Sequence, residues 1–354
     1  MKRIDERDII FSRANYEKGK ENYEDYYKRN PDKKSVDDSL RSRPNLCEEG
    51  TMTYNEVNSK MASAAFEFLG NINHLCEATV SSTKVDVNSK IITKRIKGFA
   101  KHYGAAVVGV TKLQDYHIYT HRGRTLENYG EKINLNHKYA IVFGYEMNTD
   151  MLNRSPMLPE TIETSKGYVG VSLIGMMLTY FIGSLGYEAR NHMDANYLVM
   201  PVLVAKDAGL GDIGRNTILT NKDYGSRLRL GVVTTDLELE IDDPVDFGLE
   251  DFCNMCKKCS FICPSQSLTN EPKFDINGNY NWTIDVESCY AKWRYLGTDC
   301  GMCLSICPFS QNLDTIKNTV TFKDNPQLIK DALDEYKKKY KNRPFAPGNP
   351  DWMR

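Results

Sequence analysis

The sequence lacks a strong net charge, a long uninterrupted hydrophobic run and a recognisable export signal. The formal charge is −1 over 354 residues, which gives no electrostatic basis for binding DNA or an anionic membrane. The most apolar stretch, residues 168–183, is short and interrupted by glycine, so it predicts a buried helix and no transmembrane segment. Residues 1–23 contain no apolar core followed by a small-residue cleavage site, and we therefore expect a cytoplasmic protein.

Motifs of several common enzyme classes are also missing, including the P-loop, the zinc-protease helix and the serine-hydrolase elbow. The run GLGDIG at residues 209–214 does fit the dinucleotide pattern G-x-G-x-x-G, with Asp236 beyond it. Its context does not fit, because no strand directly precedes it and no apolar helix follows. We interpret this run as a glycine-rich turn that lines some other ligand.

Cysteine is the residue type that carries the chemistry. Of ten cysteines, eight fall between residues 253 and 307, in spacings that favour metal binding in a reducing compartment over disulfides. The first run reads C-x2-C-x2-C-x3-C-P. The second ends in the same way, but ten residues separate its first cysteine, Cys289, from Cys300.

Such runs hold [4Fe–4S] clusters, and the fourth cysteine of each run serves the other cluster. Zinc is the alternative, but no histidine lies among these cysteines. The spacing predicts that the first cluster is held by Cys253, Cys256, Cys259 and Cys307, and the second by Cys263, Cys289, Cys300 and Cys303.

The rest of the chain predicts an α+β protein. Residues 28–44 have the composition of a surface loop, and a helix is expected from Ser89, which can cap its start, to Gly104. Buried strands are expected at 105–110, 138–147, 197–205 and 227–239. We predict four parts: an N-terminal region packing on the core (1–88), an α/β domain (89–250), a cysteine-rich two-cluster domain (251–312) and a tail (313–354).

Residues 205–259, from AKDAGLGDIG to CNMCKKC, resemble the reductive dehalogenase family, which is related to epoxyqueuosine reductase. DERDIIFSR (5–13), YTHRGR (119–124) and SLGYEAR (184–190) extend the resemblance over nearly the whole chain. It implies a nitroreductase-like α/β core that binds cobalamin or another corrinoid, with a C-terminal ferredoxin-like domain. Two [4Fe–4S] clusters would supply the electrons.

The resemblance also implies a site. Tyr168 would be the proton donor at the head of the apolar helix, and Arg229 its basic partner. A nearby guanidinium would lower the pKa of the phenol and stabilise the phenolate. The residues implied near the corrinoid or the pocket are His192, Asp194, Gly209, Gly211, Thr220 and Tyr224.

The leading hypothesis is a reductive dehalogenase that acts on a small organohalide and takes electrons from an external low-potential donor. Family members exported for respiration carry a twin-arginine signal, so either such a signal was removed or the enzyme stays in the cytoplasm. Two alternatives remain. A tRNA-modifying epoxyqueuosine reductase is less favoured, since that family uses an aspartate acid and this chain lacks a basic stripe. A non-catalytic electron carrier or corrinoid-handling protein would not need so large a pocket domain.

Overall fold

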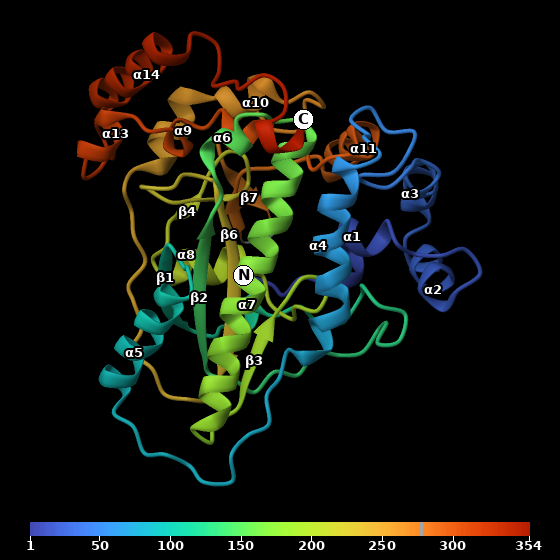
Figure 1. The fold of residues 1–354 in the computed structure, drawn as a ribbon, viewed down its shortest axis with the longest axis vertical. Coiled ribbons are helices and arrows are strands. Elements are labelled where there is room, and N and C mark those ends of the chain that lie inside the picture. The colour runs from blue at the N-terminus through green and yellow to red at the C-terminus, as the bar shows by residue number, and fades with distance from the viewer. Residues whose placement is uncertain (277–278) are drawn as a thin grey trace.

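The computed structural model describes residues 1–276 and 279–354 (Figure 1). Its centre is a four-stranded sheet in the order β1-β2-β6-β3, in which every neighbouring pair is antiparallel. Two small two-stranded ribbons, β4-β5 and β7-β8, lie outside it. The strands are β1 (Val107–Lys112), β2 (Tyr139–Glu146), β3 (Ala189–His192), β4 (Asp212–Ile213), β5 (Leu219–Thr220), β6 (Leu228–Thr235), β7 (Phe274–Ile276) and β8 (Asn279–Asn281).

Helices cover both faces of the central sheet. The helices of the described residues are α1 (Ile10–Arg13), α2 (Glu21–Arg29), α3 (Lys34–Arg41), α4 (Asn58–Ile72), α5 (Ser89–His102), α6 (Thr149–Leu152), α7 (Leu158–Ser184), α8 (Pro201–Asp207), α9 (Leu249–Cys256), α10 (Lys258–Ile262), α11 (Val286–Leu296), α12 (Met302–Ser305), α13 (Asp314–Asn318) and α14 (Pro326–Tyr340). Of these, α5 and α7 cover one face of the sheet, and α8 covers the other. This mixture of helix and sheet agrees with the predicted α+β class.

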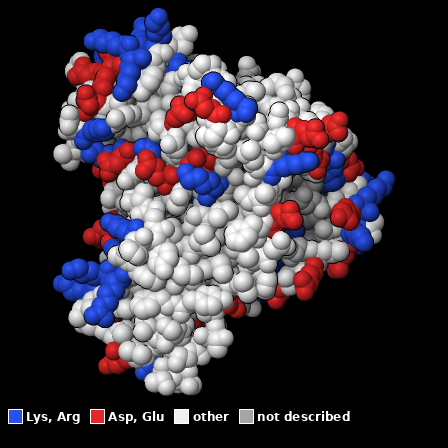
Figure 2. All heavy atoms as spheres, viewed as in Figure 1, with Lys and Arg blue, Asp and Glu red and all other residues white. Residues whose placement is uncertain are grey.

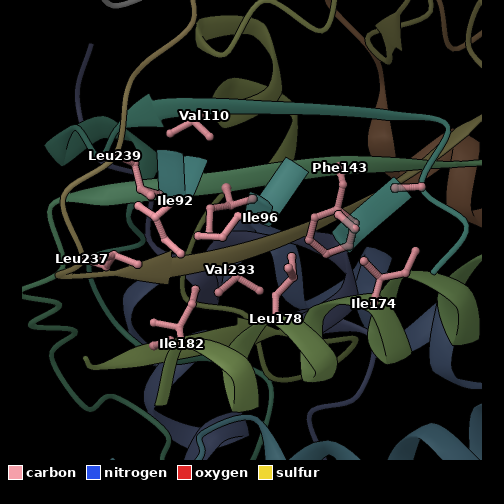
Figure 3. Close-up of a cluster of buried hydrophobic side chains, with 14 of the residues drawn as sticks. Ile92, Ile96, Val110, Phe143, Ile174, Leu178, Ile182, Val233, Leu237 and Leu239 are labelled. Carbon is pink, nitrogen blue, oxygen red and sulfur yellow. The ribbon is translucent and has the colours of Figure 1, made fainter. Parts of the chain in front are cut away.

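The side chains of the strands alternate between two hydrophobic layers. Phe143 of β2 points toward α7, as Figure 3 shows beside Leu178, and Ile141 belongs to the same layer. Ala140 and Val142 belong to the opposite layer, which α8 covers. Packing in these two layers fixes the position of β6, and Arg229 is the second residue of that strand.

Helix α7 is 27 residues long and runs the length of the molecule between α4 and the sheet (Figure 1). By length and composition it could cross a membrane, but half of its most apolar window is buried within the fold. The buried helix predicted for 168–183 is confirmed, although it starts at Leu158. Tyr168 therefore lies in the third turn and not at the head of the helix.

Three local predictions were wrong. Residues 197–205 are not a strand, because Pro201 starts α8 in the first-turn position that proline favours. Residues 28–44 include helix α3, which buries only Leu40 and Asp37, and Asp37 is paired with Arg13. Helix α5 is capped by Asn88, which accepts a hydrogen bond from the Ile91 N–H at 3.1 Å, and not by Ser89.

The chain ends pack around the cysteine-rich segment. Helices α9 and α10 lie beside α13 and α14 at one end of the molecule (Figure 1), and a single aromatic core joins them through Phe252, Phe309 and Phe322. On another side, α1 and α3 from the N-terminal region pack on α11. The cysteine-rich segment thus contacts both ends of the chain.

Candidate functional site

The first four cysteines predicted to bind a cluster line one cavity. Cys253 and Cys256 come from α9, Cys259 from α10, and Cys307 from the position just before the short 3-10 helix Pro308–Ser310. Phe252 and Phe309 line the same cavity. The loop between α9 and α10 turns at Lys257, whose φ of +50° lies in the left-handed region. This turn lets both helices present thiols to one space.

The other four cysteines line a second cavity of about 120 Å³: Cys263, Cys289, Cys300 and Cys303. Cys289 reaches it from α11, so the segment between Cys289 and Cys300 is largely helical. Gly297, with φ of +83°, ends this helix and turns the chain back toward Cys300. The eight thiols are thus divided between the two cavities as the cysteine spacing predicts.

The cysteine thiols stand around these cavities without converging on a point. Within the described ranges, no three His, Cys, Asp or Glu side chains lie close enough together to hold a single metal ion. Burial raises the pKa of most of the thiols, to about 12 for Cys256 and Cys300 and about 11 for Cys289. A metal group that binds them must therefore displace protons.

A third cavity, of about 300 Å³, adjoins the second one. Tyr168 and Arg229 both line it, as do Trp293 and Asp299, which also line the second cysteine cavity. Helix α7 places Thr161, Thr164 and Tyr168 on this cavity because residues three, four and seven apart share a helix face. We name this the tyrosine cavity.

Arg229 is held against both Tyr168 and Asp299. Its guanidinium carbon lies 5.0 Å from the centre of the Tyr168 ring. Its Nη2 donates to Thr164 Oγ1 at 2.7 Å and to Asp299 Oδ2 at 3.2 Å. Close approach to the helix is possible because residue 167 is glycine: a β-carbon there would lie 2.5 Å from Arg229 Cγ.

The pKa of Tyr168 is raised, against our expectation. Burial is the largest effect and disfavours the phenolate, and the neighbouring Arg229 offsets it only in part. Tyr168 is therefore a protonated phenol at neutral pH and can donate a proton, but it is not an unusually acidic one.

A pair of carboxyl groups lies beneath Arg229. Burial and the charge of Asp299 raise the pKa of Glu160 well above its ordinary value. Burial alone would raise the pKa of Asp299 as well, but hydrogen bonding from Glu160 and the charge of Arg229 lower it. The pair thus carries one proton, on Glu160, and Asp299 is the counter-ion of Arg229.

The remaining predicted residues are scattered. Asp194 lines the tyrosine cavity. His192 does not line it; it is buried in β3, where its Nε2 lies 2.9 Å from Thr234 Oγ1 and its Nδ1 accepts from the Leu198 N–H. Tyr224 lies half-buried under the guanidinium of Arg227.

The glycine-rich turn faces the protein itself. Gly209 and Gly211 pack against backbone oxygens, with a β-carbon there 2.3 Å from Asp243 O and 2.4 Å from Thr220 O. Thr220 lines the first cysteine cavity. The structure therefore does not bring these residues to the tyrosine cavity.

Several residues of the tyrosine cavity were not anticipated. Arg124 lies 4.4 Å over the ring of Tyr197, and Tyr290, Trp293 and Asp299 come from the stretched cysteine run. For the last three the available signal was the run itself, because a long insertion between two ligands of one site must lie near that site; Arg124 ends the YTHRGR stretch (119–124).

Comparisons with known proteins agree with this geometry. Residues 252–311 match the model of a 4Fe-4S dicluster domain. Over 185 residues the chain is 33% identical to the tetrachloroethene reductive dehalogenase of Desulfitobacterium hafniense, covering 49% of this chain and 33% of that protein. Over 225 residues it is 30% identical to the enzyme of the same name from Dehalobacter restrictus, covering 60% of this chain and 40% of the relative. Over 49–60% of its length, the chain is similar to tetrachloroethene reductive dehalogenases.

The resemblance read from the sequence is thus confirmed. A solved catabolic reductive dehalogenase superposes with a TM-score of 0.77 at 22% identity, covering 97% of this chain and 47% of that one. A second solved reductive dehalogenase, whose structure is described as suggesting a mechanism for B12-dependent dehalogenation, superposes with a TM-score of 0.71 at 23% identity. The match covers 94% of this chain and 43% of that one. The epoxyqueuosine reductase of Lactococcus garvieae is 29% identical over 170 residues, which is 46% of each protein. The chain spans only about a third to two-fifths of the first two curated relatives.

Proposed function

We propose that the protein is a corrinoid-dependent reductive dehalogenase that replaces a carbon-bound halogen by hydrogen. Two [4Fe–4S] clusters would relay the electrons, and the core would be nitroreductase-like. The observation that carries the proposal is the pair of shared walls: Trp293 and Asp299 line both the second cysteine cavity and the tyrosine cavity. An electron-supplying site and a protonated phenol are therefore neighbours.

The residues present suit the proposed groups. Each cysteine cavity offers four thiols, which is the ligand set of a [4Fe–4S] cluster. Around the tyrosine cavity, the buried Nε atoms of Arg124 and Arg229 have no hydrogen-bond acceptor among the described residues, and a corrinoid carries amide oxygens at its edge. The cavity alone is smaller than a corrinoid, so the proposal of this cofactor relies on the chemistry of the walls and on the relatives.

A bound corrinoid would supply a low-potential cobalt that can deliver electrons to a carbon–halogen bond. The overall reaction consumes two electrons and one proton and yields a carbon–hydrogen bond and a halide ion. Tyr168 would give the proton to carbon. Arg229, 5.0 Å from that ring, would stabilise the phenolate left behind. Asp299 would keep Arg229 in place through the 3.2 Å contact.

The alternatives fit less well. A tRNA-modifying enzyme needs a basic surface for the phosphate backbone, and on the face shown in Figure 2 lysine and arginine are interspersed with aspartate and glutamate. An electron carrier without substrate chemistry would not require a cavity with a protonated phenol beside its second cysteine site.

Anaerobic reconstitution with iron, sulfide and cobalamin tests the proposal. We expect about eight iron atoms and one cobalt per chain, as two cubane clusters and one corrinoid require, and halide release from an organohalide with a strong reductant. Absence of cobalt, or turnover of an epoxyqueuosine-containing tRNA in place of the organohalide, would refute it.

Tyr168→Phe tests the proton donor. The variant should keep its iron and cobalt but lose roughly 10²–10⁴-fold in turnover, the usual contribution of a general acid. Tyr180→Phe is the matched control, because Tyr180 lies on the same helix but is 45% exposed. Equal activity of the two variants would remove Tyr168 from the mechanism.

A further inference from the structure

The glycine-rich turn, which does not reach the tyrosine cavity, leads directly to a buried arginine. Arg215 follows Gly214 and is only 1% exposed. It lines the first cysteine cavity together with Gly214 and Asn216. Arg215 lies in the connection between strands β4 and β5, and Gly211 allows a close approach to the backbone of Thr220. The turn thus directs a cationic side chain to the first set of thiols.

Arg215 is anchored by backbone oxygens. Its Nη1 donates to Thr269 O and Glu271 O, both at 2.8 Å, and its Nε to Cys253 O at 3.2 Å. The guanidinium lies 4.1 Å over the ring of Trp282. Among the side chains that the structure describes, no carboxylate lies within ion-pair distance of it. The charge is therefore buried and positioned, but not neutralised by these neighbours.

A buried, unneutralised cation is costly unless an anion is near. Burial lowers the pKa of Arg215, while the thiols of Cys253, Cys259 and Cys256 act in the opposite direction. An arginine stays protonated at any physiological pH. A cluster held by four thiolates in the cavity that Arg215 lines would supply the missing negative charge.

The two cysteine cavities differ in charge. The charged side chains that line the first are Arg215, Lys257 and Lys258, and its described walls include no aspartate or glutamate. The second is lined by a single lysine, Lys292, and by Asp299, whose charge is already paired with Arg229 at 3.2 Å. A cluster gains negative charge when it is reduced, so a cation in its wall favours reduction, most strongly where water is excluded.

We propose that Arg215 sets the reduction potential of the cluster in the first cavity, raising it above that of the cluster in the second. This inference rests on the proposed function only in requiring a [4Fe–4S] cluster in each cavity. Arg215 acts through its permanent charge and would be a tuning residue, not a catalytic one.

The test is a redox titration of the full chain, loaded with both clusters and followed by electron paramagnetic resonance. Arg215→Gln should lower the ratio of reduced to oxidised first cluster at least tenfold at a given potential, a shift of about 59 mV for one electron. The second cluster should not shift. Arg215→Lys should restore most of the potential.

Lys257→Gln is the matched control. It removes the same charge from the same cavity wall, but from a side chain that water partly screens. The shift that it causes in the reduction potential of the first cluster should be clearly smaller than the shift caused by Arg215→Gln. An Arg215→Gln variant that keeps all its iron and titrates like the wild type would overturn the inference.

If Arg215→Gln does not retain iron, Asn254→Asp decides the question. Asn254 Oδ1 lies 3.4 Å from Arg215 Nη2, so the variant adds a carboxylate partner while every backbone contact of Arg215 remains. The reduction potential of its first cluster should fall by more than it does in Lys257→Gln. An unchanged potential would overturn the inference. A wild-type protein without clusters would instead refute the proposed function.

Discussion

Replacing Gly167 by alanine tests whether the position of Arg229 matters. A β-carbon at residue 167 would lie 2.5 Å from Cγ and 3.1 Å from Cβ of Arg229, whereas carbon atoms in contact are about 3.5–4.0 Å apart. The arginine stem must therefore move by about 1 Å. Its guanidinium would then leave both its 3.2 Å contact with Asp299 and its place over Tyr168.

A misplacement of about 1 Å in a catalytic group can cost about 10²-fold in rate, and we expect a loss of this order in halide release. The stability change should be small. Alanine gains about 1 kcal/mol over glycine inside a helix, and overpacking costs about 1–3 kcal/mol, so the free energy of unfolding should fall by about 0–2 kcal/mol.

Gly70→Ala in α4 is the matched control, because no atom lies within 4 Å of a β-carbon there. The free energy of unfolding of this variant should rise by about 1 kcal/mol, and its turnover should equal that of the wild type. Halide release by the loaded enzyme and thermal unfolding measure the two effects separately. Wild-type turnover in Gly167→Ala would show that the close approach of Arg229 to α7 has no role in the reaction.

Three further outcomes follow from the same contacts. Because the pKa of Tyr168 is raised above 10.0, its proton-donating form persists across neutral pH. If transfer of this proton limits turnover, the rate should not decline until the pH exceeds about 10. A decline near neutral pH that the Tyr168→Phe substitution abolishes would contradict the assignment of Tyr168 as the donor. The raised pKa of Glu160 means that its protonated form stabilises the fold below its ordinary pKa of 4.5, and that this contribution is lost as pH rises through the raised value. The melting temperature of Glu160→Gln relative to wild type should therefore increase as the pH rises above 4.5, and a constant difference would argue against a shared proton. Cys289→Ser should reduce the iron content by about half, since Cys289 lines only the second cavity; loss of all iron would show that the clusters assemble together.

The sequence predicted those parts of the fold whose signal is local. The division of the eight cysteines between two cavities follows from their spacing, and β1, β2 and β6 follow from apolar runs that the sheet buries on both faces. Where a run contains a proline, as at Pro201, the same composition gives a helix instead.

The tyrosine cavity could be predicted only in part. Resemblance identified Tyr168 and Arg229, and the structure brings them together. Glu160 and Asp299 carry no recognisable pattern, because they become partners only when α7 meets the loop before Cys300. The direction of the shift in the Tyr168 pKa could not be predicted from the sequence either, because it depends on how far burial outweighs one neighbouring charge.

The exchange of cysteines between the two runs ties their fates together. Cys307 from the second run lines the first cavity, and Cys263 from the first run lines the second. Neither run can complete a site alone, so deleting either run would leave both cavities without their full set of four cysteines. Losing either run therefore costs both sites, whereas losing a single cysteine such as Cys289 costs only one.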